Sequence, residues 1–221
     1  ALHRGQEPLA DPDVVDPPAD VASTAIAPGI PVAVDVTLVR VQRLLEAELA
    51  SKHGRTEDAV DVLRRGLEVV PDDQRLLYAR ALVYERMDRV EEALRDLQRM
   101  VALNPDDPDA LNALGYTLAD RTQRFEEAQV LIEKALALKP DEPAIIDSLG
   151  WVLFRRGEAA KAEIQLRKAF EMQPDAEIAA HLGEVLWSLG RRDEARRIWD
   201  EGKARDADNP TLRATVMRLD R

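Results

Sequence analysis

The stretch "DSLGWVLFRRG", Asp147–Gly157, decides the fold because the chain repeats its pattern on either side. The related segment "NALGYTLADRT" begins 35 residues earlier, at Asn112, and "AHLGEVLWSLG" begins 33 residues later, at Ala180. In each copy a Leu-Gly pair is followed by residues that favour helix. Self-similarity at a fixed period of roughly 20–50 residues is typical of proteins built from stacked repeats.

Columns of small residues extend this period over five units. In the second helix of each unit an alanine recurs at spacings of 34, 35, 34 and 33 residues, at Ala59, Ala93, Ala128, Ala162 and Ala195. A proline stands twelve residues after each of the first four alanines, and Ala207 takes that place in the fifth unit. Antiparallel helices approach closely where small side chains lie at their crossing. The columns therefore predict five helical hairpins.

The residues between these columns are helical in pattern. From about Val36 onward, apolar residues recur at i, i+3, i+4 and i+7. Short segments separate the helical pieces, namely "PDDQ", "PDDP", "PDEP", "PDAE" and "DADNP". Aspartate caps helix N-termini and proline is tolerated in a first helical turn, so these segments indicate where helices begin.

This arrangement resembles the tetratricopeptide repeat, whose signature is W-x2-L-G-x2-Y, then A-x3-F, then P. The matching residues of the fourth unit are Ile146, Leu149, Gly150, Leu153, Ala162, Leu166 and Pro174. The resemblance covers about residues 38–207 and implies an all-α, right-handed α-solenoid of about five hairpins. The units are expected at about 40–73, 74–107, 108–142, 143–175 and 176–209, within 37–207, and a capping helix at 210–221.

Residues 1–36 have a different composition from the repeats. They carry six prolines and six acidic residues against one basic residue, Arg4. This composition predicts an extended or disordered segment. Its apolar part, Ser23–Val36, is interpreted as a tether to the first helix or, alternatively, as a strand-like segment lying in a groove of its own chain or of a neighbour. The second interpretation allows self-association through the N-terminal segment.

Charge and composition exclude several function classes. The net charge of −11 argues against a nucleic-acid binder, which needs clustered positive charge. The chain has no cysteine, and its three histidines form no metal-binding pair at i, i+4. We find no Gly-rich phosphate loop and no apolar run approaching the ~20 residues of a membrane span. We therefore expect no catalytic residues, metal site, cofactor or direct membrane insertion, and we interpret His181 as a surface histidine with satisfied partners.

The resemblance also implies where a partner would bind. In the family, the second, fifth, ninth, twelfth and thirteenth residues of each unit tend to face a concave groove formed by the first helices. Carried over by position, the candidate groove residues are Tyr78, Arg86, Asn112, Tyr116, Asp147, Trp151, Phe154, Arg155, Glu184 and Trp187. Five of the chain's nine aromatic residues are among them, which suits an extended peptide or a partner helix. The alternative is that these rings pack between repeats.

Two hypotheses for function follow. The first is a non-catalytic scaffold or adaptor whose groove binds a protein or peptide. The second is an architectural spacer that self-associates and leaves its groove empty. The region from about residue 74 to 207 most resembles the C-terminal repeats of proteobacterial lipoproteins that are associated with the outer membrane. One such lipoprotein is a protease adaptor. This resemblance implies a periplasmic location, with a lipid anchor supplied outside this chain, and recruitment of a protease or its substrates; the alternative is the cytoplasm.

Overall fold

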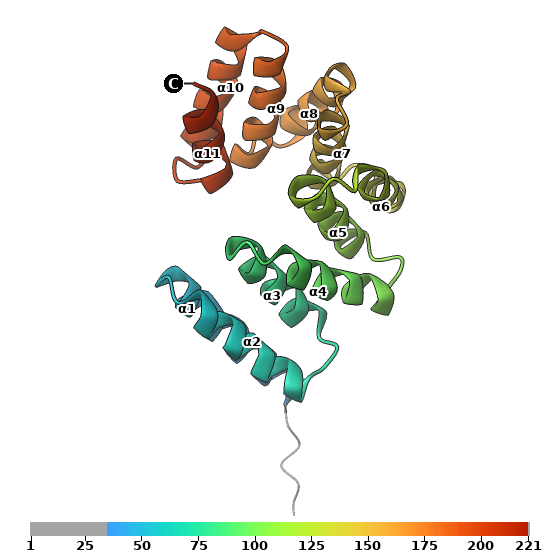
Figure 1. The fold of residues 1–221 in the computed structure, drawn as a ribbon, viewed down its shortest axis with the longest axis vertical. Helices are drawn as coiled ribbons and strands as arrows, with labels where there is room; N and C mark the ends of the chain where they lie inside the picture. Colours follow the sequence, from blue (N-terminus) through green and yellow to red (C-terminus); the bar gives the residue numbers. More distant parts are fainter. Residues whose placement is uncertain (1–34, 221) are drawn as a thin grey trace, which may run out of the picture. The chain divides into compact units, whose positions relative to one another are not determined.

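The computed structural model describes residues 35–220, which form eleven α-helices and no β-strand (Figure 1). The predicted all-α repeat fold is confirmed. Helix α1 begins at Val36, so the last residue of the expected extended segment is helical. The remaining predictions for the N-terminal segment lie outside the described residues, apart from Asp35, which caps α1.

The helices form five hairpins in chain order, each made of two consecutive helices that pack together. The pairs are α1 (Val36–Lys52) with α2 (Thr56–Val69), α3 (Gln74–Arg86) with α4 (Val90–Leu103), α5 (Pro108–Arg121) with α6 (Phe125–Leu138), α7 (Pro143–Arg155) with α8 (Ala159–Met172), and α9 (Ala176–Ser188) with α10 (Arg192–Arg205). The last helix, α11 (Pro210–Leu219), packs on α9 and α10 at the C-terminal end of the array (Figure 1). Among residues 35–220, no helix is both long and apolar enough to cross a bilayer.

Acidic residues begin most of the first helices. The side chains of Asp35, Asp73 and Asp107 each accept hydrogen bonds from two backbone amides of the helix that follows. These bonds satisfy amides that have no partner within the helix. At the end of α7, Gly157 takes a φ of 82°, a conformation that favours glycine. In unit two Asp88 occupies the same place with a φ of 58°, which aspartate tolerates better than most residues.

The small-residue columns lie at the helix crossings. The five repeat alanines are fully buried: Ala59, Ala93, Ala128, Ala162 and Ala195. A Cβ atom added at Gly150 would lie 2.6 Å from Cγ of Leu166, and one at Gly115 would lie 2.6 Å from Cγ1 of Ile132. These distances are too short for a side chain, so the regular spacing reflects contact between the two helices of each hairpin. The cost of glycine within a helix, up to ~1 kcal/mol relative to alanine, is offset by this close packing.

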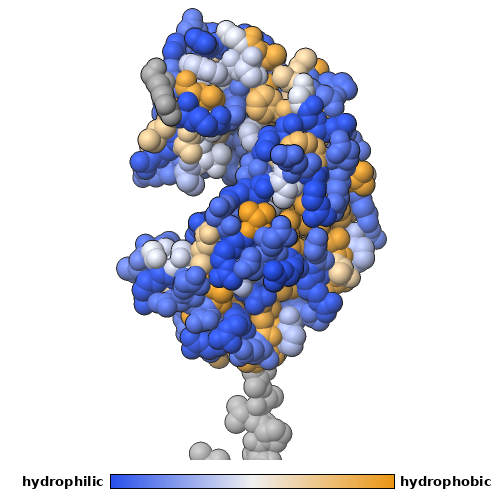
Figure 2. Space-filling model, viewed as in Figure 1, coloured by the Kyte–Doolittle hydropathy of each residue, from blue (hydrophilic) through white to orange (hydrophobic). Residues whose placement is uncertain are grey.

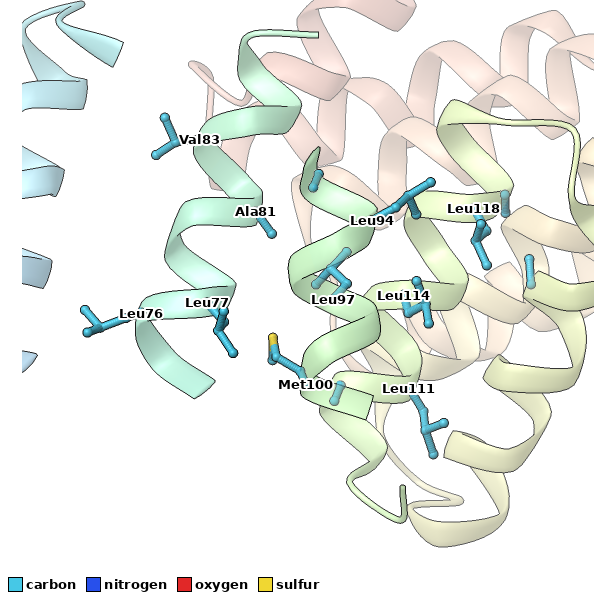
Figure 3. Packing of buried hydrophobic residues seen from close by; sticks show 14 of the residues in the cluster. Leu76, Leu77, Ala81, Val83, Leu94, Leu97, Met100, Leu111, Leu114 and Leu118 are labelled. Carbon is cyan, nitrogen blue, oxygen red and sulfur yellow. The ribbon is translucent and has the colours of Figure 1, made fainter. Parts of the chain in front are cut away.

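Leucine, alanine and valine fill the interior along the array. In Figure 3, Leu77 of α3 points toward Met100 of α4, whereas Leu76 points toward the preceding hairpin. Leu76 is fully buried there and approaches the position of Gly66 in α2. From the second unit onward, each hairpin thus packs its first helix against its own second helix and against the preceding unit.

The first helices of successive units are not evenly spaced. Helix α1 contacts α3, α5 contacts α7, and α7 contacts α9. Between residues 35 and 220, the backbones of α3 and α5 do not come as close, although α5 packs on α4 just as α3, α7 and α9 pack on the second helix before them. Because the backbones of α3 and α5 stand apart, space remains between the first helices of units two and three. The pocket described next opens there.

Candidate functional site

A pocket of about 440 Å³ opens on the first helices of units two to five. The volume lies within the ~300–1,000 Å³ typical of binding pockets. The residues that surround it are Tyr78, Ala81, Leu82, Glu85, Leu97, Asp109, Asn112, Ala113, Tyr116, Thr117, Ala144, Asp147, Ser148, Gln173, Asp175, Glu177 and Ile178. Figure 2 shows a hollowed surface bordered by hydrophilic residues with smaller hydrophobic patches. We call this cavity the acidic pocket, because its lining includes five carboxylates and no lysine, arginine or histidine.

Glu85 of α3 is a half-buried member of this lining. The hydroxyl of Thr117 on α5 lies 2.7 Å from Oε1 of Glu85 and 2.9 Å from the carbonyl oxygen of Ala113, so both acceptors compete for one hydrogen. Burial raises the pKa of Glu85 because it removes water from the charged form. The hydrogen bond from Thr117 to Glu85 thus connects α5 to α3 across the space between these two helices.

A chain of polar side chains runs from the pocket into the core. The hydroxyl of Tyr116 lies 3.4 Å from Oε1 of Glu177 and 3.3 Å from Nε2 of His181. On the other side of the imidazole, Nδ1 lies 2.9 Å from Oδ2 of Asp147. The His181 ring is stacked on Trp151, with 4.3 Å between ring centroids. Tyr116, Asp147 and Glu177 line the pocket, and His181 lies behind them.

Burial and neighbouring charges both shift the pKa values of these hydrogen-bonded side chains. Burial by itself lowers the pKa of His181, but the charge and hydrogen bond of Asp147 outweigh it, and the pKa is raised. Burial raises the pKa of Glu177. It also raises that of Tyr116 well above 10.0, with Asp120 and other neighbouring acids adding to the shift. The hydroxyl of Tyr116 therefore stays protonated and able to donate at neutral pH.

Sequence reasoning missed the role of His181, and its interpretation as a surface residue is wrong. Its side chain is only 2% exposed. The available signal was spacing: His181 and Asp147 are 34 residues apart, close to one repeat, so they lie on adjacent first helices. Their side chains meet because α7 and α9 are in contact.

The predicted groove residues fall into two groups. Four of them line the acidic pocket: Tyr78, Asn112, Tyr116 and Asp147. The other six lie elsewhere: Arg86, Trp151, Phe154, Arg155, Glu184 and Trp187. Arg86 borders a second cavity of about 400 Å³ formed by α1, α2 and α3. The prediction that all ten bind a partner stays a prediction, but the structure does not bring them into one surface.

Trp151 is covered by neighbouring repeats instead of projecting into a groove. It is 7% exposed, and its Nε1 atom donates to Oδ1 of Asp120 at 3.2 Å. Arg155 donates to the backbone carbonyl of Asp120 at 2.7 Å, and Phe154 lies against Trp151 with centroids 5.6 Å apart. The reason is that α7 packs against α5 on one side and α9 on the other, which leaves no open side for the indole. The alternative expectation, packing between repeats, describes this ring.

Glu184 and Trp187 lie at the C-terminal end of the array. Arg218 of α11 donates to Oε2 of Glu184 at 2.6 Å. The Trp187 ring stacks on Trp199 with centroids 5.4 Å apart, and the guanidinium of Arg192 lies 5.0 Å from its centre. Glu184 therefore contacts the capping helix α11, whereas Trp187 packs against α10 of its own unit.

No group of three or more His, Asp or Glu side chains within residues 35–220 is arranged to hold a metal ion. The polar groups of the pocket lining are carboxylates, hydroxyls, two side-chain amides and two phenol rings.

Comparison with known proteins agrees with this architecture. Three family models described as tetratricopeptide repeat match residues 48–113, 84–149 and 148–210. The chain belongs to the tetratricopeptide repeat family. It is 48% identical over 176 residues to the TPR repeat-containing protein PA4667 of Pseudomonas aeruginosa, a match that covers 80% of this chain. The chain spans about 30% of the length of that relative.

Solved tetratricopeptide repeat structures share the fold. The thermophilic TPR protein TTC0263 of Thermus thermophilus superimposes with a TM-score of 0.69 at 24% identity, covering 81% of this chain and 98% of that one. Pseudomonas aeruginosa PilF superimposes with a TM-score of 0.62 at 21% identity, covering 83% and 84%. At these identities the likeness concerns the arrangement of helices.

Proposed function

We propose that this tetratricopeptide repeat chain is a non-catalytic scaffold that binds a peptide or a partner helix in the acidic pocket. The observation that carries the proposal is the cavity of about 440 Å³ formed by the first helices of four successive units. Tetratricopeptide repeats generally mediate protein–protein interaction, and stacked repeats offer extended surfaces for it.

Two tyrosines give the pocket its anchoring rings. Tyr78 is 43% exposed, so its phenol ring is open to a ligand. Tyr116 is half-buried and its hydroxyl is held by Glu177 and His181. Tyrosine supplies contact area at low entropic cost, and it is enriched at binding hot spots. Trp151 supports the pocket from behind by stacking on His181.

A display library of random short peptides, selected on the immobilised full chain, tests this function. We expect binders whose affinity falls about tenfold or more when Tyr78 is replaced by Ala. The matched control is Ile164→Ala, an exposed apolar residue of α8 away from the pocket, which should leave affinity unchanged. Binders that tolerate Tyr78→Ala and Asn112→Ala equally well would contradict binding in this pocket.

The compartment and the client belong to the same proposal. The resemblance of residues 74–207 to outer-membrane-associated lipoproteins supports a periplasmic scaffold that recruits a protease or its substrates, with its anchor outside this chain. Fractionation of cells producing the full-length protein tests the location. Recovery in the outer-membrane fraction is expected, whereas recovery in the cytoplasm would support the alternative.

A second candidate function is supported by α1. This helix exposes an apolar stripe at spacings of three and four residues: Leu38, Val41, Leu45 and Leu49 are 64%, 46%, 61% and 55% exposed. Such a stripe on one helix face is typical of a packing surface. It favours the architectural hypothesis, in which copies of the chain associate.

Light scattering coupled to size-exclusion chromatography tests this second function. An associated species that dissociates in Leu45→Glu would support α1 as the contact, and one that dissociates after deletion of residues 1–34 would support the N-terminal segment. A monomer at every concentration would contradict self-association.

A further inference from the structure

We infer that the acidic pocket receives a cationic side chain, lysine or arginine, from the bound polypeptide. This inference rests on the proposed scaffold function and specifies the chemistry of its ligand. Three features of the pocket support it: the charges of the lining, the hydrogen bonds already made there, and an exposed ring at the edge.

The five carboxylates differ in how far they are already neutralised. Asp109 forms an ion pair with Lys139 at 2.8 Å, and Asp147 is hydrogen-bonded to His181. By contrast, Glu85 and Glu177 accept hydrogen bonds from the hydroxyls of Thr117 and Tyr116 and form no ion pair within residues 35–220. Asp175 likewise has no ion pair there; it accepts the backbone amide of Glu177 at 2.8 Å. Three carboxylates therefore face the cavity without an ion-pair partner among the described residues.

A further lining residue has an unmet hydrogen-bond acceptor. The Oδ1 atom of Asn112 is buried and has no partner in the described part of the chain. A buried acceptor without a donor costs free energy, which a ligand that donates hydrogen bonds can restore. The hydroxyls of Tyr116, Thr117 and Ser148 are already directed at acceptors, so the neutral donors left in the lining are the Tyr78 hydroxyl and the amides of Asn112 and Gln173. What the lining lacks is a donor that carries positive charge.

Lysine and arginine meet both requirements. An ammonium group carries three donors and a guanidinium carries five, and neither has an acceptor. The exposed Tyr78 ring at the pocket can also contact the cation or its aliphatic stem. An acidic peptide would instead meet three carboxylates that have no ion-pair partner among the described residues, which disfavours it. Charge complementarity in the pocket therefore selects a basic partner. The net charge of −11 of the whole chain also attracts cations at long range, so the test has to separate these two effects.

Binding of peptides that differ at a single residue tests this inference. Short synthetic peptides taken from the display selection are prepared with Lys, Arg, acetyl-lysine, citrulline or Glu at the basic position, and their dissociation constants are measured by fluorescence anisotropy on the full chain. We expect Lys and Arg peptides to bind about tenfold or more tightly than acetyl-lysine and citrulline peptides. The Lys and Arg arms show which cation the pocket prefers.

Matched variants separate the pocket from the overall charge of the chain. The double variant Glu85→Gln and Glu177→Gln should remove the preference for the cation while leaving the weaker citrulline peptide unaffected. The control Glu91→Gln and Glu201→Gln makes the same change in net charge at exposed positions outside the pocket, and it should keep the preference. Circular dichroism checks that both double variants fold. If the double pocket variant does not fold, Glu85→Gln and Glu177→Gln are tested singly.

The outcomes distinguish the two proposals. If selected binders carry no basic residue but lose affinity with Tyr78→Ala, the cation inference is overturned and the scaffold function stands. The inference is also overturned if the double pocket variant keeps the full preference for Lys or Arg. If the full chain selects no binder at all, the scaffold function itself fails.

Discussion

The imidazole of His181 on α9 is held 2.9 Å from the carboxylate of Asp147 on α7, in a contact that joins units four and five. Both side chains are buried, at 2% and 8% exposure. The same imidazole reaches Tyr116 on α5, so one residue links three first helices. The open pocket and the packed interior of the array meet at this histidine.

This contact predicts a pH-dependent contribution to stability. Because the pKa of His181 is raised above 6.5 in the folded chain, its stabilising effect is fully present below 6.5 and is lost as pH rises through the folded pKa. We expect the difference in free energy of unfolding between wild type and His181→Gln to be largest at mildly acidic pH and to shrink as pH rises. Urea unfolding across this pH range measures it. A difference that does not vary with pH would contradict a charged His181–Asp147 pair.

The glycine column predicts that added volume is harmful where it meets the second helix. Gly150→Ala places a Cβ 2.6 Å from Cγ of Leu166 and should destabilise the array by about 1–3 kcal/mol. In Gly66→Ala the nearest atoms are side-chain atoms of Leu76 and Arg43, at 3.0 and 3.1 Å. We expect a smaller loss there, or a gain, because alanine favours helix by up to ~1 kcal/mol. Equal losses in urea unfolding of the two variants would show that close crossing does not explain the glycines.

Replacing Trp151 or Tyr78, two of the predicted groove aromatics, with alanine should affect different properties: stability for Trp151 and peptide affinity for Tyr78. Trp151 is 7% exposed and stacked on His181, so Trp151→Ala should cost about 3–5 kcal/mol in unfolding free energy. Tyr78 is 43% exposed, so Tyr78→Ala should leave stability within about 1 kcal/mol and act on peptide affinity. Thermal unfolding measures the loss of stability, and fluorescence anisotropy titration measures the loss of peptide affinity, for each variant. A stable Trp151→Ala variant that loses only peptide binding would argue against its packing role.

The raised pKa values of Glu85 and Glu177 predict the pH dependence of ligand binding. Both carboxylates must be ionised to attract a cation, and burial raises both pKa values above 4.5. Affinity for a lysine peptide should therefore fall as pH decreases toward these raised values, and binding near them should release protons. Calorimetry in two buffers of different ionisation enthalpy measures this release. Proton release that persists unchanged in the Glu85→Gln and Glu177→Gln variant would assign it to other groups.

Much of the fold could be predicted from the sequence because its causes are local or strictly periodic. The crossing of two helices in a hairpin needs a small residue at a given place, and that need recurs in every unit, as Gly150 and Ala162 show. Helix starts were visible because a capping aspartate acts within three residues, as Asp73 does for α3. These features depend on residues of one hairpin and can be read along the chain.

The lining of the site depended on how neighbouring hairpins meet. Position within a unit placed Tyr78 and Trp151 in the same class, yet one ring is open and the other is covered. The difference arises because the backbones of α3 and α5 stand apart while α7 packs on both α5 and α9, and no single unit contains that information.

The amino-acid sequence alone determined the helical hairpins, their number and their period, since each follows from residues that are close in the chain. Tertiary structure alone decided which side chains remain open: it half-buried Glu85 and Glu177 beside a cavity and covered Trp151. The physical reason is that solvent exposure in a stacked array is set by the spacing between units. That spacing results from contacts among several helices of different units.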